Sequence, residues 1–317
     1  MAMSNNGIDV SIVFTNWNTR DFMRDCIRSV YEKTKGITYE IIVVDDGSTD
    51  GSIEMLRKEF PEVKLVVNER NLGVAKAYNR GVAIAMGRYI QMLNTDMVLV
   101  NNAVKILVDF LKSHPDAGAC GGRLRNRDMT SQISYGIFPS FTQALVDASF
   151  LKEIFPKWGL SGVGTIPSES LTEPAEVEYI TGADMLIRKT VVDKLGFFDE
   201  RYTSYCEESD FCYRIRHQTD WKLYFVPEAE IIHFGGMSFK NVREYQYQLM
   251  YSSYNKFFKK HHGSLYSFAT RLLYAFQYVV KFIARSLKYY TRRDKDHKQL
   301  VIDAYWQVKY SLFPGNR

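Results

Sequence analysis

Acidic and amide side chains gather directly after three short apolar runs in the first 100 residues. Thr15-Asn16-Trp17-Asn18 follows the first run, Asp45-Asp46 closes the second, and Asn94-Thr95-Asp96 follows a later one. Carboxylates at such positions can accept hydrogen bonds from a nucleotide base or from ribose hydroxyls. A single Asp can also hold Mg²⁺ or Mn²⁺, because such hard cations take their remaining ligands from phosphate and water. These residue types favour a crevice that binds a nucleotide together with a divalent cation.

Each of these motifs also has a structural interpretation. Ser48 or Asp50 can cap the helix that follows, and Asp96 can be an ordinary turn residue. Capping explains Asp50, but it does not explain two adjacent acids at the end of a buried strand. Ligand binding is therefore the favoured interpretation of Asp45 and Asp46.

A second acidic group, Glu207-Glu208-Ser209-Asp210, stands just before a helical pattern that runs through Phe211 and Ile215. Acids are common at helix N-termini because they interact favourably with the helix dipole. Two adjacent Glu residues also crowd like charges, which can raise the pKa of one of them toward that of a general base. The residue types alone leave both interpretations open.

His233 ends the apolar segment that contains Ile231 and Ile232. Taken alone, a His at a strand end is more often a structural hydrogen-bonding group than a metal ligand. Cys206, Cys212 and His217 do not have the spacing of a common zinc site. The four cysteines show no paired spacing and indicate reduced thiols in a cytosolic setting.

The elements that must position these residues follow an alternating pattern. Four short apolar runs predict buried strands over Val10–Phe14, Glu40–Val44, Lys64–Val67 and Tyr89–Leu93. Helical patterns between them cover Asp21–Lys33, Ser52–Glu59 and Val74–Met86. Strands that alternate with helices in this way predict an α/β fold with a doubly wound, mostly parallel sheet, in which ligands bind beyond the carboxyl ends of the strands.

The later part of the chain returns to regular patterns after residue 178. We expect a strand through Met185–Ile187, a short helix, and a strand that ends at His233. The composition, 46% hydrophobic and 24% charged, is that of a globular protein and excludes general disorder. The first residues lack a basic stretch followed by an apolar one, so no secretory signal is expected.

Taken together, the motifs resemble family 2 of the inverting glycosyltransferases with the GT-A fold, and in particular its bacterial rhamnosyltransferase-like branch. The resemblance covers residues 8–240 and rests on six blocks in order, Val10–Asn18, Ile42–Asp50, Asn71–Gly81, Leu93–Met97, Gly182–Arg214 and Ile232–Ser238. It implies a Rossmann-like sheet flanked by helices, a catalytic domain over residues 1–240, nucleotide-sugar binding over about 1–115 and an acceptor side over about 116–240.

The resemblance also implies roles for individual residues. Asp45 would contact the nucleotide base, and the donor-binding positions are Thr15, Trp17, Asn18, Asp45, Asp46, Asn71, Gly73, Lys76, Asn94 and Thr95. Many family members carry Asp-x-Asp where this chain has Asn94-Thr95-Asp96, which leaves Asp96 as the main ligand of Mg²⁺ or Mn²⁺. In some relatives a His completes that site, here His233. By position Glu208 is the catalytic base, with Glu207 as the alternative.

The implied reaction moves a hexose from a nucleoside-diphosphate sugar to a polyprenyl-diphosphate-linked saccharide in cell-surface polysaccharide synthesis. Attack is in line and inverts the anomeric carbon, with no covalent enzyme intermediate. The favoured donor is dTDP-rhamnose, with a UDP-sugar as the alternative. A sugar-nucleotide pyrophosphorylase would normally carry a Gly-rich loop after the first strand, where this chain has Thr15–Asn18. A non-catalytic nucleotide-sugar-binding protein remains as the third class.

The end of the chain differs from the rest in charge. Residues 1–239 carry 26 Lys and Arg against 32 Asp and Glu, a net −6, whereas residues 240–317 carry 15 against 4, a net +11. From Tyr245 the sequence has a helical pattern. We therefore expect residues 241–317 to form a basic, aromatic-rich, amphipathic helical tail that associates with a membrane.

Within this tail, apolar residues recur at helical spacing, with Lys281, Arg285 and Lys288 on the other side of the helix. The apolar residues are Phe268, Leu272, Phe276, Val279, Ile283 and Leu287. Arg271 and Lys281 interrupt the segment too closely for a transmembrane helix, which needs about 20 mostly apolar residues. The pattern favours an anionic lipid surface and a cytoplasmic protein held peripherally on the inner face of the plasma membrane.

Two other partners would explain an amphipathic tail. It could pack onto the catalytic domain, or onto a second subunit in an oligomer. Nucleic acid is not an expected partner, because no recognition motif accompanies the positive charge.

Overall fold

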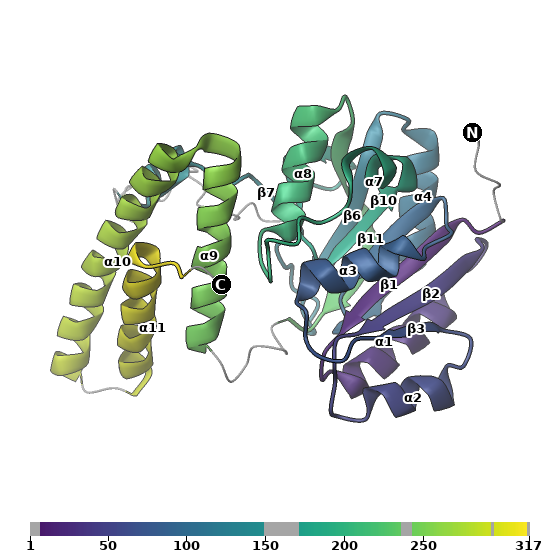
Figure 1. Cartoon of the computed structure of the whole chain (residues 1–317), viewed down its shortest axis with the longest axis horizontal. Coiled ribbons are helices and arrows are strands. Elements are labelled where there is room, and N and C mark those ends of the chain that lie inside the picture. Colours follow the sequence, from purple (N-terminus) through teal and green to yellow (C-terminus); the bar gives the residue numbers. More distant parts are fainter. Residues whose placement is uncertain (1–6, 149–170, 236–242, 293–294, 316–317) are drawn as a thin grey trace. The chain divides into compact units, whose positions relative to one another are not determined.

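Figure 1 shows the computed structural model, which describes residues 7–148, 171–235, 243–292 and 295–315. The chain divides into two compact units, and the first contains every described strand. The second consists of residues Ser204–Cys206 and the helices α5 (Phe141–Ala148), α9 (Arg243–His262), α10 (Ser264–Arg292) and α11 (Lys295–Leu312). Helix α5 thus groups with the C-terminal helices although it precedes residue 240 in the sequence.

Parallel strands form the first half of the main sheet, in the order β3-β2-β1-β4. They are β1 (Val10–Asn16), β2 (Tyr39–Asp45), β3 (Lys64–Val67) and β4 (Tyr89–Leu93). The helices between them are α1 (Arg20–Lys33), α2 (Ser52–Glu59) and α3 (Val74–Ala83). These elements confirm the alternation predicted from the sequence. Helix α3 ends three residues before the predicted end at Met86. The N–H groups of Ile84 and Ala85 donate to carbonyl groups three residues earlier instead of four, which closes the last turn of the helix.

The second half of the main sheet is mixed. Strand β10 (Asp184–Arg188) is antiparallel to both β4 and β6 (Ala117–Arg125), and β11 (Lys222–His233) is parallel to β6 but antiparallel to β5 (Met97–Leu99). The remaining elements are α4 (Ala103–Ser113), β7 (Tyr135–Gly136), β8 (Ala175–Val177), β9 (Tyr179–Ile180), α7 (Lys189–Leu195) and α8 (Glu207–Gln218). The α/β fold class is confirmed, but the sheet is wholly parallel only through β4. Periodicity reveals a strand but not its direction, which the connections set.

Both faces of β1 are covered, which explains why this strand is apolar at almost every position. On one face Ile12 and Phe14 pack with Ile27 of α1. On the other face α3 approaches so closely that a Cβ at Gly81 would lie 2.6 Å from Val13 Cγ1. Figure 1 shows α3 crossing this face of the sheet. The two layers hold the carboxyl ends of the parallel strands in place, and the polar motifs begin there.

The regular elements described in the second unit are all helices. Helix α10, with 29 residues, packs against α9 and α11. Helix α5 joins it through Phe141, whose backbone N–H donates to the Tyr266 hydroxyl at 2.6 Å. Across the described residues, no helix has an apolar stretch long enough to cross a membrane.

Candidate active site

Asp45 lies at the centre of a hydrogen-bonded network at the ends of β1 and β2. Asn16 Nδ2 donates to Asp45 Oδ2 at 2.7 Å, and the Ser48 N–H donates to Asp45 Oδ1 at 2.8 Å. Asp45 is 0% exposed. These bonds tie Asp45 to the turn after β2, at the strand end where the resemblance implied contact with a nucleotide base.

Asp46 holds a different loop. Its Oδ1 accepts a hydrogen bond from Asn68 Nδ2 at 2.7 Å, and its Oδ2 accepts one from the Gly73 N–H at 3.0 Å. Gly73 has a φ of +91°, and a Cβ there would lie 2.7 Å from Thr203 O, so only glycine fits without displacement. Asp46 is also buried. It therefore fixes the wall formed by the loop before α3 and offers little surface to a ligand.

The exposed surface of this edge comes from other predicted donor residues. Trp17 is 39% exposed, and Asn18, Asn71 and Lys76 are exposed as well. Asn18 adopts a left-handed conformation with φ +54°, and its Oδ1 accepts a hydrogen bond from the Thr49 N–H at 2.8 Å. These side chains face solvent at the carboxyl ends of the strands, where a nucleotide binds in open α/β sheets.

Thr95 connects the end of β4 to the end of β1. Its hydroxyl lies 2.8 Å from that of Thr19, which in turn donates to Asn16 Oδ1 at 2.7 Å. Asn94 is half-buried, and its backbone N–H donates to Ala183 O at 3.0 Å. One chain of hydrogen bonds thus joins Thr95, after β4, to Asn16 at the end of β1.

Asp96 and His233, the two predicted metal ligands, lie side by side. His233 Nε2 is 3.4 Å from Asp96 Oδ1, and both side chains are largely buried. The Phe234 N–H donates to Asp96 O at 2.9 Å, which fixes the end of β11 beside Asp96. Nε2 has no hydrogen-bond partner among the described residues. In those same ranges no third His, Cys, Asp or Glu joins the pair.

Glu207 and Glu208 form the first turn of α8, where the sequence had predicted them just ahead of the helix. Tyr205 and Cys206 enter this turn with φ +68° and +65°, a conformation that costs residues with a Cβ about 1–2 kcal/mol each. Such strain is commonly found where a structure must direct functional groups. The two residues turn the chain so that both carboxyl groups start the helix.

The two carboxyl groups have different surroundings. Glu207 is buried, and its Oε2 has no hydrogen-bond partner within the described part of the chain. Glu208 is half-buried and packs against Gly182, where a Cβ would lie 3.1 Å from Glu208 Cγ. Burial raises the pKa of both groups, and the charge of Glu208 raises the pKa of Glu207 further. Both groups are therefore poised to hold or accept a proton.

Tyr78 of α3 is a buried tyrosine whose pKa responds to the charges of both Glu207 and Asp96. Its hydroxyl is buried and donates to Leu93 O at 3.1 Å. Burial raises the pKa of Tyr78, and the charges of Glu207 and Asp96 raise it further, while a hydrogen bond with Thr15 lowers it. The carboxyl groups on α8 and after β4 therefore act electrostatically on one hydroxyl. Sequence reasoning missed Tyr78, which has the spacing of an ordinary core position on α3.

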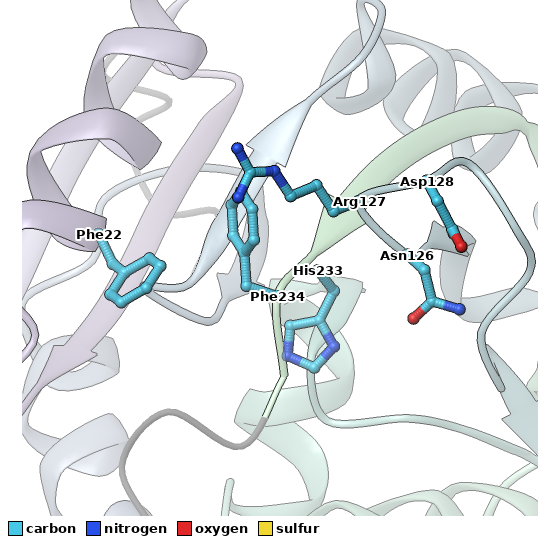
Figure 2. Close-up of a pocket in the computed structure, with 6 residues that line it drawn as sticks. All are labelled: Phe22, Asn126, Arg127, Asp128, His233 and Phe234. Atoms are coloured by element: carbon cyan, nitrogen blue, oxygen red, sulfur yellow. The ribbon is translucent and has the colours of Figure 1, made fainter. Parts of the chain in front are cut away.

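A pocket of about 530 Å³ opens beside His233. Phe22 and Phe234 line it with ring centroids 5.6 Å apart, together with Asn126, Arg127 and Asp128. Figure 2 shows Phe22 on one side of Phe234 and the turn that carries the three polar residues on the other. Sequence reasoning missed this turn as well, because it lies in a segment without clear periodicity.

Asp210 and the cysteines do not join the site. Asp210 Oδ2 accepts a hydrogen bond from Arg214 Nε at 2.8 Å within α8. Arg214 also donates to the carbonyl groups of Leu195 and Gly196. Asp210 therefore anchors α8 to the end of α7. All four cysteines are buried, and the described residues contain no metal-binding group around Cys206 or Cys212.

The fold and the strand-end site define a glycosyltransferase of the GT-A class. The model of "Glycosyl transferase family 2" matches residues 11–196, which is more than half of the chain. The chain therefore belongs to glycosyltransferase family 2, and the resemblance stated from the sequence is confirmed.

Relatives of this chain agree with that assignment. An N-acetylglucosaminyl-diphospho-decaprenol L-rhamnosyltransferase of Mycobacterium tuberculosis is 28% identical over 209 residues, which span 61% of this chain and 66% of that protein. The mannosyltransferase PcManGT from Pyrobaculum calidifontis, solved with GDP-Man and Mn²⁺, has a TM-score of 0.59 at 14% identity, over 96% of this chain and 86% of that one. GalNAc-T7, solved with UDP, GalNAc and Mn²⁺, gives 0.56 at 17% identity, over 82% and 53%. The two structures support the fold.

Proposed function

We propose that this protein transfers a hexose, with inversion, from a nucleoside-diphosphate sugar to a polyprenyl-diphosphate-linked saccharide in cell-surface polysaccharide synthesis. The name of the mycobacterial relative supports this acceptor class and rhamnose as the sugar. The observation that carries the proposal is the pair Asp96 and His233 at the strand ends, where His233 Nε2 lies 3.4 Å from Asp96 Oδ1 and has no hydrogen-bond partner among the described residues. Such a pair can hold the cation that transfer from a nucleoside diphosphate requires.

The residues around Asp96 fit a divalent cation. Two atoms that bind one octahedral cation at about 2.1 Å lie about 3 Å apart, and His233 Nε2 lies 3.4 Å from Asp96 Oδ1. The buried Nε2, without a hydrogen-bond partner among the described residues, is the unsatisfied atom that a cation would need. Mg²⁺ or Mn²⁺ bound there supplies positive charge that offsets the charge of the leaving diphosphate. Asp96 and His233 are therefore the proposed metal ligands.

Glu208 is the proposed base. A base must reach the acceptor hydroxyl, and Glu208 is half-buried whereas Glu207 is buried. The raised pKa of Glu208 makes it a stronger proton acceptor than an ordinary carboxylate. Glu207 keeps its own proton more tightly because burial and the Glu208 charge both raise its pKa. Glu207 is therefore the alternative rather than the first choice for the base.

The donor is proposed to bind along the exposed edge formed by Trp17, Asn18, Asn71 and Lys76, with Thr15, Asn94 and Thr95 beneath it. Asp45 is proposed to contact the nucleotide base, and Asp46 and Gly73 to form the adjoining part of the donor site. The proposed donor is dTDP-rhamnose, and a UDP-sugar is the alternative.

The helical unit is proposed to meet an anionic membrane surface, peripherally and on the cytoplasmic side of the plasma membrane. The apolar stripe of α10 is exposed, and we call it the α10 stripe: Leu265, Phe268, Leu272, Phe276, Val279, Ile283, Leu287 and Tyr290. Spacings of three and four residues keep these side chains on one side of the helix. An exposed apolar face of this length marks an interaction surface.

The cations of α10 do not flank this stripe. Arg271 Nε donates to Ser311 O at 3.1 Å, and Arg285 Nη1 donates to Leu300 O at 3.2 Å, so both side chains hold α10 against α11. Lys281 lies over the Tyr278 ring. Of the three cations that the sequence analysis placed opposite the stripe, Arg285 thus serves this packing. The proposed lipid contact is therefore mainly apolar, with Lys288 among the exposed cations of the unit.

A donor screen tests the enzymatic proposal. The full chain is incubated with dTDP-rhamnose, UDP-glucose, UDP-N-acetylglucosamine or GDP-mannose and with Mg²⁺ or Mn²⁺, and release of nucleoside diphosphate is measured with and without an undecaprenyl-diphosphate-N-acetylglucosamine analogue. We expect acceptor-stimulated release from dTDP-rhamnose, and none from Glu208→Gln. If the acceptor stimulates release only from a UDP-sugar, the donor is that UDP-sugar and not dTDP-rhamnose. No release from any donor would favour the non-catalytic binding protein.

A further inference from the structure

The usefulness of His233 as a metal ligand depends on which ring nitrogen carries its proton. A neutral imidazole has one N–H donor and one nitrogen with a free lone pair, and only the second can bind a cation. The nitrogen that faces Asp96 is Nε2, at 3.4 Å from Asp96 Oδ1. Nδ1 must therefore hold the proton if Nε2 is to bind metal.

Gln132 contacts the other ring nitrogen. Gln132 Oε1 lies 3.0 Å from His233 Nδ1, and Gln132 Nε2 donates to the backbone carbonyl of His233 at 2.6 Å. A carbonyl oxygen can only accept, so the amide nitrogen must be the atom that points to it. That fixes Oε1 toward Nδ1. Because Oε1 also can only accept, the partner Nδ1 has to carry the hydrogen.

Asn126 holds the Gln132 amide in this orientation. Gln132 Nε2 also donates to Asn126 Oδ1 at 2.6 Å, while Asn126 Nδ2 donates to Thr130 Oγ1 at 2.9 Å. These residues belong to the turn after β6, where the Arg125–Ser131 bridge closes the chain on itself. The orientation is thus set by a folded turn rather than by one flexible side chain.

We propose that Gln132 is a positioning residue, which keeps the proton of His233 on Nδ1 and so leaves Nε2 free for a divalent cation shared with Asp96. This inference rests on the proposed function, because it assumes a cation at that site. Partners of metal-binding histidines that hydrogen-bond the other nitrogen typically change metal affinity by about 10–100-fold when removed. Gln132 meets that description although it lies on a different element from His233.

The test begins with a measurement that needs neither metal nor substrate. The full chain is labelled with ¹⁵N-histidine, and the His233 ring signals are assigned by their loss in His233→Gln. A long-range ¹H–¹⁵N spectrum at pH 8 distinguishes the two tautomers. We expect the Nδ1–H form in the native chain, a shift toward the Nε2–H form in Gln132→Leu, and a restored Nδ1–H form in Gln132→Glu, whose carboxylate can still accept. An unchanged spectrum in Gln132→Leu would overturn the proposal.

The second measurement uses Mn²⁺ alone, titrated into each variant and followed by the electron paramagnetic resonance of the free ion. Gln132→Leu should bind Mn²⁺ about 10–100-fold more weakly than the native chain, and Gln132→Glu should recover affinity. Asp193→Ala, which removes an exposed carboxylate of α7 outside this turn, is the control and should stay within about twofold. If the tautomer shifts in Gln132→Leu but Mn²⁺ affinity does not change, the link from Gln132 to the cation is wrong.

A failure of the proposed function looks different. In that case Asp96→Ala and His233→Gln would bind Mn²⁺ as tightly as the native chain, which would remove the cation site itself. The Gln132 proposal would then fall in its metal-binding part, and the tautomer spectrum would still decide whether Gln132 orients the ring.

Discussion

Helices α1 and α10 have the same kind of amphipathic pattern but opposite surroundings. In α1 the apolar residues Met23, Ile27 and Val30 are all 0% exposed, because the sheet covers them. In α10 the corresponding residues Leu265 and Phe276 are 81% and 58% exposed. A helical pattern therefore predicts which residues share a face, but it does not predict what covers that face. The α/β unit keeps its reactive polar groups at the strand ends, whereas the helical unit presents an apolar surface.

If the α/β unit carries out the reaction and the helical unit binds the membrane, Asp96→Ala should have the largest effect on turnover. We expect turnover to fall by about 10³-fold or more, because the leaving diphosphate would lose the cation that offsets its charge. Release of nucleoside diphosphate to a water-soluble acceptor analogue measures this change, and EDTA should reproduce it in the native chain. Asp193→Ala, which removes an exposed carboxylate far along the chain, is the control. Full activity in EDTA would remove the metal from the mechanism.

Glu208→Gln should have the next largest effect. We expect kcat to fall by about 10²-fold or more while donor binding survives, because the amide cannot accept the acceptor proton. Glu207→Gln should lower kcat less, since the Glu207 side chain is buried. Steady-state kinetics together with donor binding by calorimetry separate the two effects. If Glu207→Gln is the more damaging change, the roles of the two residues must be exchanged.

Polar substitutions in the α10 stripe should weaken membrane binding by the helical unit without affecting the chemistry of the α/β unit. Phe276→Gln combined with Ile283→Gln should weaken binding to phosphatidylglycerol vesicles by about 10-fold or more, since each large apolar side chain contributes about 1.5–3 kcal/mol when fully buried. Turnover with a water-soluble acceptor should stay unchanged. Vesicle co-sedimentation measures the first effect, with Lys259→Gln on α9 as the control. Vesicle binding that survives the double substitution would point to a second subunit as the partner of the stripe. Sedimentation equilibrium would then show that the native chain dimerises and that the doubly substituted chain does not.

The smallest expected effect concerns stability. Because the pKa of Glu207 is raised in the folded protein, folding holds a proton that the unfolded chain releases above about pH 4.5. The native chain should therefore lose stability as the pH rises above that value. Glu207→Gln has no such proton, so its Tm should exceed that of the native chain by a few degrees at pH 8, and the difference should shrink toward pH 4.5. Calorimetry at both pH values measures the change, and an equal difference at both would contradict it.

Much of the framework was predictable because it depends on local patterns. The alternation of buried strands and helices through β4 follows from apolar runs of the right length, and the turn residues mark their ends. The antiparallel insertion of β10 was not predictable in the same way, since an apolar run reveals a strand but not its direction relative to its neighbours. The place of α5 beside α10 rests on a long-range contact between Phe141 and Tyr266, which no periodicity reveals.

The candidate site was predictable in composition but not in orientation. Asp96 and His233 come together as expected, because both stand at the ends of strands of one sheet. Asp45 stands at a strand end too, and its two oxygens accept hydrogen bonds from Asn16 Nδ2 and from the Ser48 N–H, which no pattern in the sequence reveals. Gln132 carried no signal at all, since its role depends on a turn that brings it to a residue distant in sequence.

The α10 stripe also has a geometrical consequence. Leu265 and Tyr290 are its first and last residues, and at about 1.5 Å per residue they lie about 38 Å apart along the helix axis. A surface that contacts the helix along a line of that length restrains tilting of the helix axis relative to that surface. By contrast, a protein held to a surface by one short loop could rotate about that loop. The stripe therefore sets the direction in which the helical unit lies on whatever surface it meets.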